Sequence, residues 1–378
     1  MVKIPTHIQT LQPYVAGKPI DELAREKKLT RIVKLASNEN PLGPSPKALA
    51  AVSDALKQIS RYVDPSSFLL VRKLAETLGK KPQQIICGAG VDALLGYIVK
   101  TFSEVGDEVL TSAGTFIGIY VNTKKHDRSL SLVPLKNYHY DLDGIRAAIT
   151  ERTRVIYLAN PNNPTGTIFT SSEFERFMSR VPREILVVLD EAYFTYAEAN
   201  SEYPNGLDYH YENLIVTRTF SKDYGLAGLR VGYAVGPDPL ISELYKVKLP
   251  FEPNFLAQEA ARAALDDVEF LRKTVTLNER SLTRMTKRFA ELGIRYIATD
   301  ANFILMLMPN EQFAVEFNQS SLDRGLIIRH VRTFGIPEGI RINSGTEEET
   351  TFALDIIEDV YTQLCKSSPH NLAGQSRG

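Results

Sequence analysis

The sequence predicts an α/β protein in which helices flank a mainly parallel sheet, joined to a second, smaller α+β domain. Between about residues 66 and 250, short apolar runs alternate with amphipathic helical patterns, an order typical of parallel sheets. Most of these runs are continuously apolar or β-branched, as expected of strands covered on both faces. After about residue 250 the pattern changes to long helical stretches and then to mixed strands and helices.

The segment before the sheet predicts an arm. Residues 1–30 are polar, contain several prolines, and show one short helical pattern over 20–28. The following stretch "KLASNENPLGPSPKAL" predicts a short strand and a loop rich in proline and glycine. After that loop, Ser45 and Pro46 open a helix.

The alternating strand and helix patterns predict the following elements. Strands are expected at "QIIC", "DEVLTS", "LSLVPL", "RVIYLAN", "ILVVLDEAY" and "LIVTRTFS". Helices are expected over 66–79, 91–103, 142–150 and 171–179, and one long helical region is expected to begin at "NFLAQEAARAAL". We therefore divide the chain into an arm (1–30), a large domain (45–265), a small domain (31–44 and 266–366) and a polar tail (367–378).

Composition points to a small-molecule partner. The chain has 44 Lys and Arg against 45 Asp and Glu, so bulk charge favours neither nucleic acid nor a membrane surface. Its two cysteines, Cys87 and Cys365, make no disulfide framework and no zinc cluster, as is usual in a reducing cytoplasm. No secretory signal and no membrane span is visible, and no metal site is expected.

A glycine turn follows the predicted strand "QIIC". "GAGVDA" matches the dinucleotide-binding pattern G-x-G-x-x-G/A. That reading also requires an acidic residue about twenty positions on, at the end of the next strand. Asp107 and Glu108 have this spacing but precede the strand "VLTS". The turn therefore either holds some other phosphate at a helix N-terminus or is a tight turn that binds nothing.

Lys222 is the first candidate catalytic residue. It follows the strand "LIVT" within "RTFSKDYGLAGLRVGY", between hydroxyl residues and a glycine-rich stretch. A lysine at such a position forms a Schiff base with a carbonyl when its pKa is lowered. Arg230, eight residues further on, suits a phosphate. Taken alone, Lys222 also fits an ordinary surface lysine.

Two more polar residues end predicted strands. Asp190 ends the apolar run "ILVVLD", where a buried carboxylate needs a cation such as a pyridinium nitrogen. Tyr193, three residues on, and Asn163 in "NPNNPTG" are candidate donors to a phenolate oxygen. Taken singly, Asp190 could instead cap the next helix, and Asn163 could belong to an ordinary turn.

Together these motifs identify a family. "LASNENPLGPSP", "RYVDPSS", "NPNNPTG", "DEAY", "RTFSKDYGLAGLRVGY" and "IRINSGTEEE" resemble the histidinol-phosphate aminotransferase group of the fold type I pyridoxal-phosphate-dependent aminotransferases. The resemblance covers about residues 10–365. It implies a large domain built on a mainly parallel seven-stranded sheet and a smaller α+β domain. It also implies pyridoxal 5′-phosphate as cofactor.

The resemblance implies a role for each matching residue around the cofactor. Lys222 matches the lysine that forms a Schiff base with the cofactor and then moves a proton, and Asp190 matches the partner of the ring nitrogen. Asn163 and Tyr193 match the partners of the phenolate oxygen, and Phe116 matches the aromatic residue that stacks on the ring. The residues matching the phosphate site are Ala89, Gly90, Val91, Thr219, Ser221 and Arg230.

The substrate site and the dimer also follow from the resemblance. Arg341 matches the arginine that holds the substrate α-carboxylate, and Arg329 matches an arginine for the distal group. Asn40 falls among the substrate-binding positions. Tyr62 matches a tyrosine that reaches the phosphate of the neighbouring subunit, which implies a homodimer. Tyr14 matches a residue contributed across the same dimer, although it also fits a stray aromatic in a loose arm.

The resemblance implies transfer of an amino group between glutamate/2-oxoglutarate and histidinol phosphate/imidazole acetol phosphate by a ping-pong mechanism. One departure leaves the amine open, because Arg332 and Phe334 stand where the family commonly has small residues and an aromatic. An aromatic amino-acid aminotransferase acting on phenylalanine or tyrosine is the alternative. A decarboxylase of a phosphorylated amino acid is less favoured, because Arg341 matches a clamp for the α-carboxylate that transamination of glutamate uses. A non-catalytic binding module on this fold is also less favoured, because the set of lysine, aspartate and arginine is complete.

Overall fold

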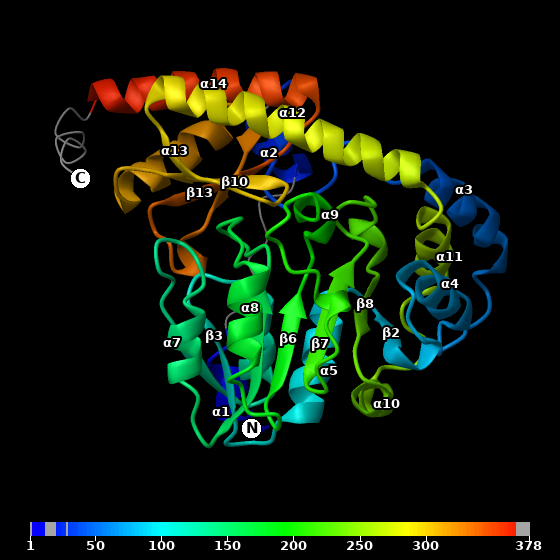
Figure 1. The fold of residues 1–378 in the computed structure, drawn as a ribbon. Helices are drawn as coiled ribbons and strands as arrows, with labels where there is room; N and C mark the ends of the chain where they lie inside the picture. Colours follow the sequence, from blue (N-terminus) through cyan, green and yellow to red (C-terminus); the bar gives the residue numbers. More distant parts are fainter. Residues whose placement is uncertain (1, 12–19, 28, 368–378) are drawn as a thin grey trace.

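The computed structural model describes residues 2–11, 20–27 and 29–367, and a seven-stranded sheet lies at the centre of this part (Figure 1). The strand order is β2-β8-β7-β6-β5-β3-β4. Only β8 runs antiparallel to its neighbours, so the predicted mainly parallel α/β fold is confirmed. The strands are β2 (Ile85–Gly88), β3 (Glu108–Ser112), β4 (Ser129–Val133), β5 (Thr153–Ala159), β6 (Leu186–Asp190), β7 (Leu214–Thr219) and β8 (Gly232–Val235).

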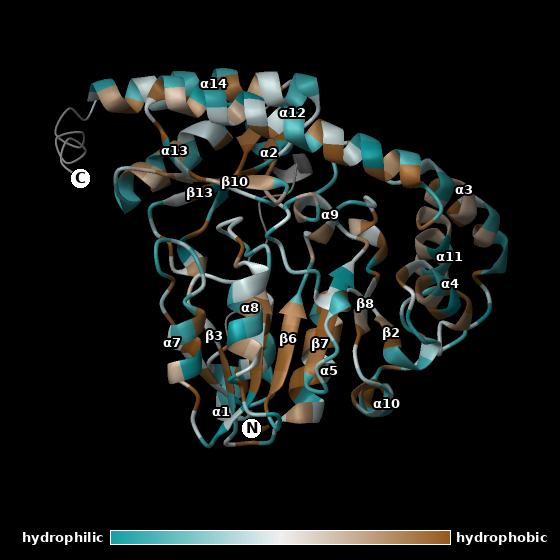
Figure 2. Ribbon diagram, viewed as in Figure 1, coloured by the Kyte–Doolittle hydropathy of each residue, from teal (hydrophilic) through white to brown (hydrophobic). Residues whose placement is uncertain are grey.

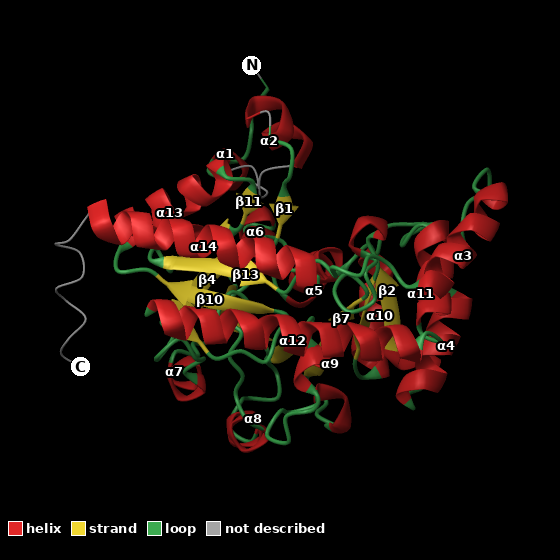
Figure 3. Cartoon of the chain, turned by 90° about the horizontal axis from the view of Figure 1, so that it is seen from above, coloured by secondary structure: helices red, strands yellow, loops and turns green. Residues whose placement is uncertain are grey.

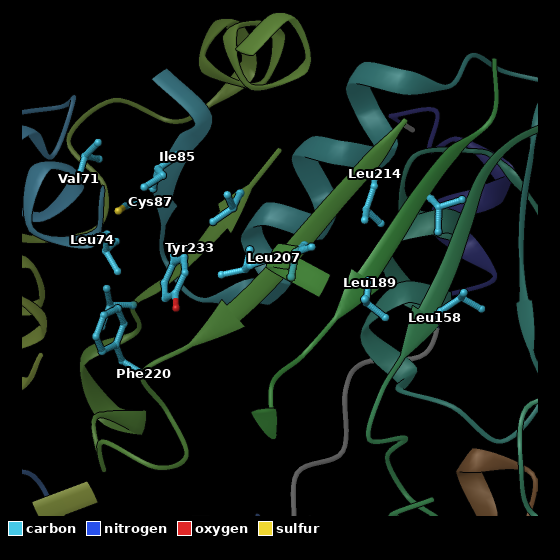
Figure 4. Packing of buried hydrophobic residues seen from close by; sticks show 14 of the residues in the cluster. Val71, Leu74, Ile85, Cys87, Leu158, Leu189, Leu207, Leu214, Phe220 and Tyr233 are labelled. Atoms are coloured by element: carbon cyan, nitrogen blue, oxygen red, sulfur yellow. The ribbon is translucent and has the colours of Figure 1, made fainter. Parts of the chain in front are cut away.

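Helices cover both faces of this sheet. Alternate strand residues separate into two apolar clusters, because successive side chains of a strand point to opposite faces. Val187 and Leu189 pack with α4, α7, α8 and α11, whereas Leu186 and Val188 pack with α5, α6 and α10. Figure 2 shows the central strands as continuously hydrophobic, and Figure 4 shows the first cluster from close by. The helices are α3 (Pro46–Ala55), α4 (Phe68–Leu78), α5 (Val91–Phe102), α6 (Ile117–Lys125), α7 (Leu142–Ala147), α8 (Ser171–Met178), α9 (Phe194–Ala197), α10 (Asp238–Val247) and α11 (Phe255–Ala264).

The C-terminal part forms a second, antiparallel sheet of order β12-β13-β10-β9. Three helices pack on one face of it, and the long helices α12 and α14 run across the top of the molecule (Figure 3). A hydrogen bond of 2.8 Å between the hydroxyls of Ser281 and Thr350 joins these two helices. The elements are β9 (Arg295–Ile297), β10 (Phe303–Leu307), β12 (Arg329–His330), β13 (Gly339–Asn343), α12 (Val268–Leu292), α13 (Glu311–Asp323) and α14 (Glu347–Ser367).

The segment before the large sheet belongs with this second unit. Strand β1 (Val33–Lys34) pairs in parallel with β11 (Leu326–Ile327), which lies almost three hundred residues further along the chain. This pairing supports our proposed domain division, in which residues 31–44 join 266–366. Ahead of β1, α1 (Thr6–Gln9) and α2 (Ile20–Lys27) occupy the arm. Of the tail expected at 367–378, only Ser367 lies within the described residues, where it ends α14.

The structure corrects three expectations. Strand β8 was not predicted, because "GYAV" is short and sits among glycines. The long helical region is two helices, since α11 ends at Ala264 and α12 begins at Val268. Strand β4 lies at the sheet edge and is only partly buried, unlike a strand covered on both faces. No helix within residues 2–11, 20–27 and 29–367 is both long and apolar enough to cross a membrane.

Candidate active site

A cavity of about 310 Å³ opens where β5, β6 and β7 end. These parallel strands are adjacent in the sheet, so the loops that follow their carboxyl ends converge there, as ligand sites of α/β proteins commonly do. Asp190 is the last residue of β6, Asn163 and Lys222 follow β5 and β7, and all three line the cavity. The opposite wall comes from residues 36–39 and from the small sheet.

Lys222 faces this cavity three residues after the end of β7. Its Nζ donates a hydrogen bond of 3.1 Å to the carbonyl oxygen of Ser37. Burial, reinforced by the positive charge of Arg341, lowers the pKa of Lys222 to about 8. An amine with this pKa is neutral in a substantial fraction near neutral pH and can act as a nucleophile or a base.

Asp190 ends β6 and is only 4% exposed. Its Oδ2 accepts a hydrogen bond of 2.7 Å from the hydroxyl of Tyr157, and its Oδ1 accepts one of 3.1 Å from the backbone N–H of Ala192. Burial raises the pKa of Asp190 to about 6 despite both donors. A carboxylate held in this way gains most from a cationic partner that enters the cavity.

Asn163, after β5, and Tyr193, three residues after Asp190, line the same cavity. The Tyr193 hydroxyl accepts a hydrogen bond of 2.8 Å from Nδ2 of Asn38, and its ring packs edge-on against Phe303. Asn163 Oδ1 accepts a hydrogen bond from Nη1 of Arg341. Asn38 was not among the predicted site residues; it has φ of 55°, a left-handed conformation that asparagine tolerates well.

The glycine turn after β2 brings a helix N-terminus up against a guanidinium. Gly90 has φ of 86° and caps the N-terminus of α5. A β-carbon on Gly90 would lie 2.5 Å from Nη2 of Arg230, so the guanidinium packs directly against this turn. Arg230, Val91, Thr219 and Ser221 line the cavity here. Backbone N–H groups, the helix dipole and an arginine together favour a single phosphate group.

Arg341 reaches the cavity from β13 of the small sheet. Its neighbours Ile340 and Ile342 pack into the helix-covered core, so strand alternation points Arg341 to the opposite face. There its guanidinium lies over the rings of Phe303 and Phe334, at 5.2 and 5.9 Å from their centres, and Nη2 donates to the Ala36 carbonyl oxygen at 2.7 Å.

Arg329 lies beside Arg341 in the same wall. The two residues are directly paired across the antiparallel strands β12 and β13, which places both side chains on the same sheet face. Both line the cavity, as does Phe116 at the start of α6. The structure thus collects two arginines on the side opposite Lys222, where an anionic substrate can meet them.

Among the predicted site residues that the structure describes, Asn40, Tyr62, Ala89 and Gly90 do not line the cavity, although Gly90 packs against Arg230, which does. Asn40 donates from Nδ2 to the Asp223 carbonyl oxygen at 2.7 Å and to Thr274 Oγ1 at 3.0 Å, and it is absent from the cavity wall, where Asn38 stands instead. Tyr62 is 84% exposed and stacks on Phe251 away from the cavity, with ring centres 4.3 Å apart. Tyr14 lies outside the described residues.

Acidic, histidine and cysteine side chains do not gather into a metal site in the part of the chain that the structure describes. The cavity therefore offers a lysine, a buried carboxylate, an anion cradle and two arginines as its reactive groups. Comparison with known proteins identifies a family whose chemistry uses such groups. Residues 30–357 match the family described as aminotransferase class I and II. The chain belongs to this aminotransferase family.

Relatives of this aminotransferase cover nearly its whole length. It is 44% identical over 359 residues to histidinol-phosphate aminotransferase 2 of Hydrogenovibrio crunogenus, covering 94% of this chain and 95% of the relative. It is 43% identical over 357 residues to histidinol-phosphate aminotransferase 2 of Pseudomonas fluorescens, with 93% and 96% covered.

A solved structure shows the same fold. The crystal structure of histidinol-phosphate aminotransferase from Sinorhizobium meliloti in complex with pyridoxal-5′-phosphate superposes with a TM-score of 0.89 at 30% identity. The match covers 96% of this aminotransferase and 99% of that chain. The expected fold type I architecture is therefore confirmed over both sheets.

Proposed function

We propose that this aminotransferase uses pyridoxal 5′-phosphate to exchange an amino group between glutamate/2-oxoglutarate and histidinol phosphate/imidazole acetol phosphate by a ping-pong mechanism. One observation carries the proposal: a single cavity holds Lys222, Asp190 and the Gly90–Arg230 cradle on one side and two arginines on the other. The names and structures of the relatives support the same substrate.

The residues of the cavity fit this cofactor. A β-carbon on residue 90 would lie 2.5 Å from Nη2 of Arg230, and α5 begins at this turn, so an arginine meets a helix N-terminus, a combination that suits a phosphate. Ala89, Val91, Thr219 and Ser221 complete this phosphate site in our proposal. Asp190 supplies the buried carboxylate that a protonated ring nitrogen needs.

The remaining cofactor contacts follow from the same cavity wall. Asn163, Tyr193 and Phe116 line the cavity. In our proposal Asn163 and Tyr193 would hold the phenolate oxygen, and Phe116 would cover a face of the ring. When bound, pyridoxal phosphate supplies a ring that accepts electrons from the substrate α-carbon. In the first half-reaction Lys222 Nζ takes the proton from the substrate α-carbon. In the second half-reaction it gives a proton to the α-carbon of the second substrate. Its lowered pKa suits Lys222 to both steps.

The two arginines determine which substrates fit. Arg341 holds the α-carboxylate of glutamate as a bidentate fork, and its position between two aromatic rings excludes water from that contact. Arg329, on the same face of the small sheet, holds the distal group: the side-chain carboxylate of glutamate or the phosphate of histidinol phosphate. Phenylalanine and tyrosine carry no distal anion for Arg329 to hold, whereas histidinol phosphate does, which favours histidinol phosphate over that alternative.

We also infer that the active unit is a homodimer. Apolar side chains are exposed around α3, α4 and the segment before α11, including Leu49 (54%), Ile59 (60%), Leu69 (58%) and Leu249 (61%). Such a surface is suited to association with a second copy. Tyr62 lies on this surface, and we propose that it reaches the cofactor phosphate of the partner.

Borohydride reduction of the purified holoenzyme tests the cofactor assignment. We expect reduction to abolish the visible absorbance band and to fix the cofactor on the peptide that contains Lys222. The Lys222→Ala protein should retain no covalently fixed cofactor after reduction. A cofactor fixed to another lysine, in the wild type or in Lys222→Ala, contradicts the site. Release of carbon dioxide instead of an oxo product contradicts transamination and favours a decarboxylase.

A further inference from the structure

Tyr157 is a tyrosine in the middle of the apolar strand β5, and its hydroxyl is not part of the chemistry described above. The ring is fully buried among residues of β2, β6 and α5. In the parallel register Tyr157 pairs with Val188, so Asp190 lies two residues further along the neighbouring strand. The hydroxyl reaches across to Asp190 Oδ2 at 2.7 Å, and the tyrosine also forms part of the cavity wall.

The Asp190 carboxylate is thus held at both oxygens. Tyr157 donates to Oδ2, and the Ala192 N–H donates to Oδ1 at 3.1 Å. Two donors on separate oxygens fix the rotation of the carboxylate plane, which one donor would leave free. A hydroxyl donor also stabilises the charged form of the carboxylate.

The other groups that face Asp190 do not replace this donor. Glu191 follows Asp190 directly after the end of β6, but that carboxylate is paired with Arg218 at 2.7 Å. Tyr193, at the start of α9, accepts its hydrogen bond from Asn38, and Lys222, after β7, donates to Ser37. Tyr140 lies near Tyr157 but donates to Thr115 Oγ1 at 2.6 Å. Thr217 on β7 pairs with Asp190 in the sheet, and its hydroxyl also favours the charged carboxylate. The Tyr157 hydroxyl donates directly to Asp190 Oδ2 at 2.7 Å.

We propose that Tyr157 is a positioning residue for the aminotransferase reaction: its hydroxyl orients the Asp190 carboxylate and limits its affinity for a proton, so that the proton shared with the cofactor stays on the ring nitrogen. The inference rests on the proposed function, because Asp190 needs the cofactor as its partner. Without the hydroxyl, Asp190 becomes the stronger base and draws the shared proton toward itself. The ring then accepts electrons less well.

The test compares holoenzymes loaded with pyridoxal phosphate that carries ¹⁵N in its ring. In Tyr157→Phe we expect the ring ¹⁵N resonance to move from the protonated toward the neutral position, and kcat to fall roughly tenfold with KM little changed. Tyr140→Phe is the matched control: it also loses a buried tyrosine hydrogen bond, but one that does not reach Asp190. Its resonance should equal that of the wild type. A Tyr157→Phe resonance identical to the wild type overturns the inference.

A second substitution covers the case in which Tyr157→Phe does not fold. Incorporating 3-fluorotyrosine at position 157 keeps the shape and strengthens the donor, so the resonance should move in the opposite direction; no movement overturns the inference. In an Asp190→Asn background, Tyr157→Phe should add no further loss of kcat, whereas a merely structural role would add the full loss. If the wild-type protein takes up no labelled cofactor, the proposed function itself fails, which is a different result.

Discussion

The guanidinium of Arg230 occupies the space that a side chain on Gly90 would need. Nη2 lies 2.5 Å from the position of a β-carbon on residue 90, closer than any real contact of that kind. Arg230 itself has φ of 60°, a left-handed conformation that is uncommon for an arginine. In our proposal the turn and the arginine together form the cradle for the cofactor phosphate, and a side chain at residue 90 would displace the guanidinium.

Gly90→Ala should weaken cofactor binding by roughly tenfold to a hundredfold, because the methyl group displaces Arg230 from the phosphate. The measurement is the dissociation constant of pyridoxal phosphate for the apoenzyme. Gly79→Ala is the matched control: Gly79 also has a positive φ, 63°, but a β-carbon there meets no atom within 4 Å. It should lower stability by about 1 kcal/mol and leave the cofactor affinity unchanged. Equal cofactor affinity in both variants would contradict the proposal that the Gly90 turn and Arg230 bind the cofactor phosphate.

Arg329→Gln should discriminate between the substrates. Because Arg329 holds the distal phosphate in our proposal, the KM for histidinol phosphate should rise by roughly tenfold to a hundredfold. The half-reaction with phenylalanine, which carries no distal anion, should change little. Arg332→Gln removes an exposed arginine that is paired with Glu311, and it serves as the control for bulk charge. Equal effects of Arg329→Gln on both amines would contradict the assignment.

Complementation between two inactive variants tests the shared site. Tyr62→Ala and Lys222→Ala fail separately in our account, because one lacks the contribution to the partner site and the other lacks the catalytic amine. When the two proteins are mixed and allowed to exchange subunits, mixed dimers contain one intact site each. About a quarter of the wild-type activity should then appear. If activity does not recover although mixed dimers form, Tyr62 serves its own subunit or none.

The apoenzyme should show the cost of burying Asp190. The pKa of this carboxyl is raised from 3.8 to about 6, so the folded chain binds its proton more tightly than the unfolded chain does. The Asp190 contribution to stability is therefore largest at low pH and is lost as the pH rises through about 6. Apo Asp190→Asn should be more stable than wild-type apoenzyme by about 1–2 kcal/mol at pH 7.5, but not at pH 4. Urea unfolding at both pH values measures this; a destabilised variant at pH 7.5 would contradict it.

Residues at the ends of buried strands were predictable from the sequence. Asp190 and Lys222 follow apolar runs whose direction in a parallel sheet brings their ends together. Arg341 stands between Ile340 and Ile342, so alternation alone sends it away from the apolar core. The glycine pattern around Gly90 left two interpretations open, a phosphate site and a tight turn that binds nothing, and the absence of a carboxylate after β3 already weakened the dinucleotide interpretation.

Other features depended on pairing between distant segments. Asn38 and Asn40 look equivalent in "SNEN", and it is the packing of the loop after β1 that turns Asn38 to Tyr193 and Asn40 to Asp223. In the sequence, Tyr157 looks like an ordinary core residue. Its hydroxyl reaches Asp190 only because of the register between β5 and β6, which the sequence does not reveal. Strand β8 was missed because its antiparallel place between β2 and β7 leaves no periodic signal in four residues.

The central claim concerns the amine that this aminotransferase accepts. Single-turnover half-reactions of the holoenzyme with histidinol phosphate, phenylalanine and tyrosine, followed by the loss of the visible band, measure it directly. The rate constant divided by the substrate dissociation constant should be greater for histidinol phosphate by more than about tenfold, because this amine alone among the three carries a distal anion that Arg329 can hold. A larger value for phenylalanine or tyrosine would contradict the proposed substrate and identify an aromatic amino-acid aminotransferase.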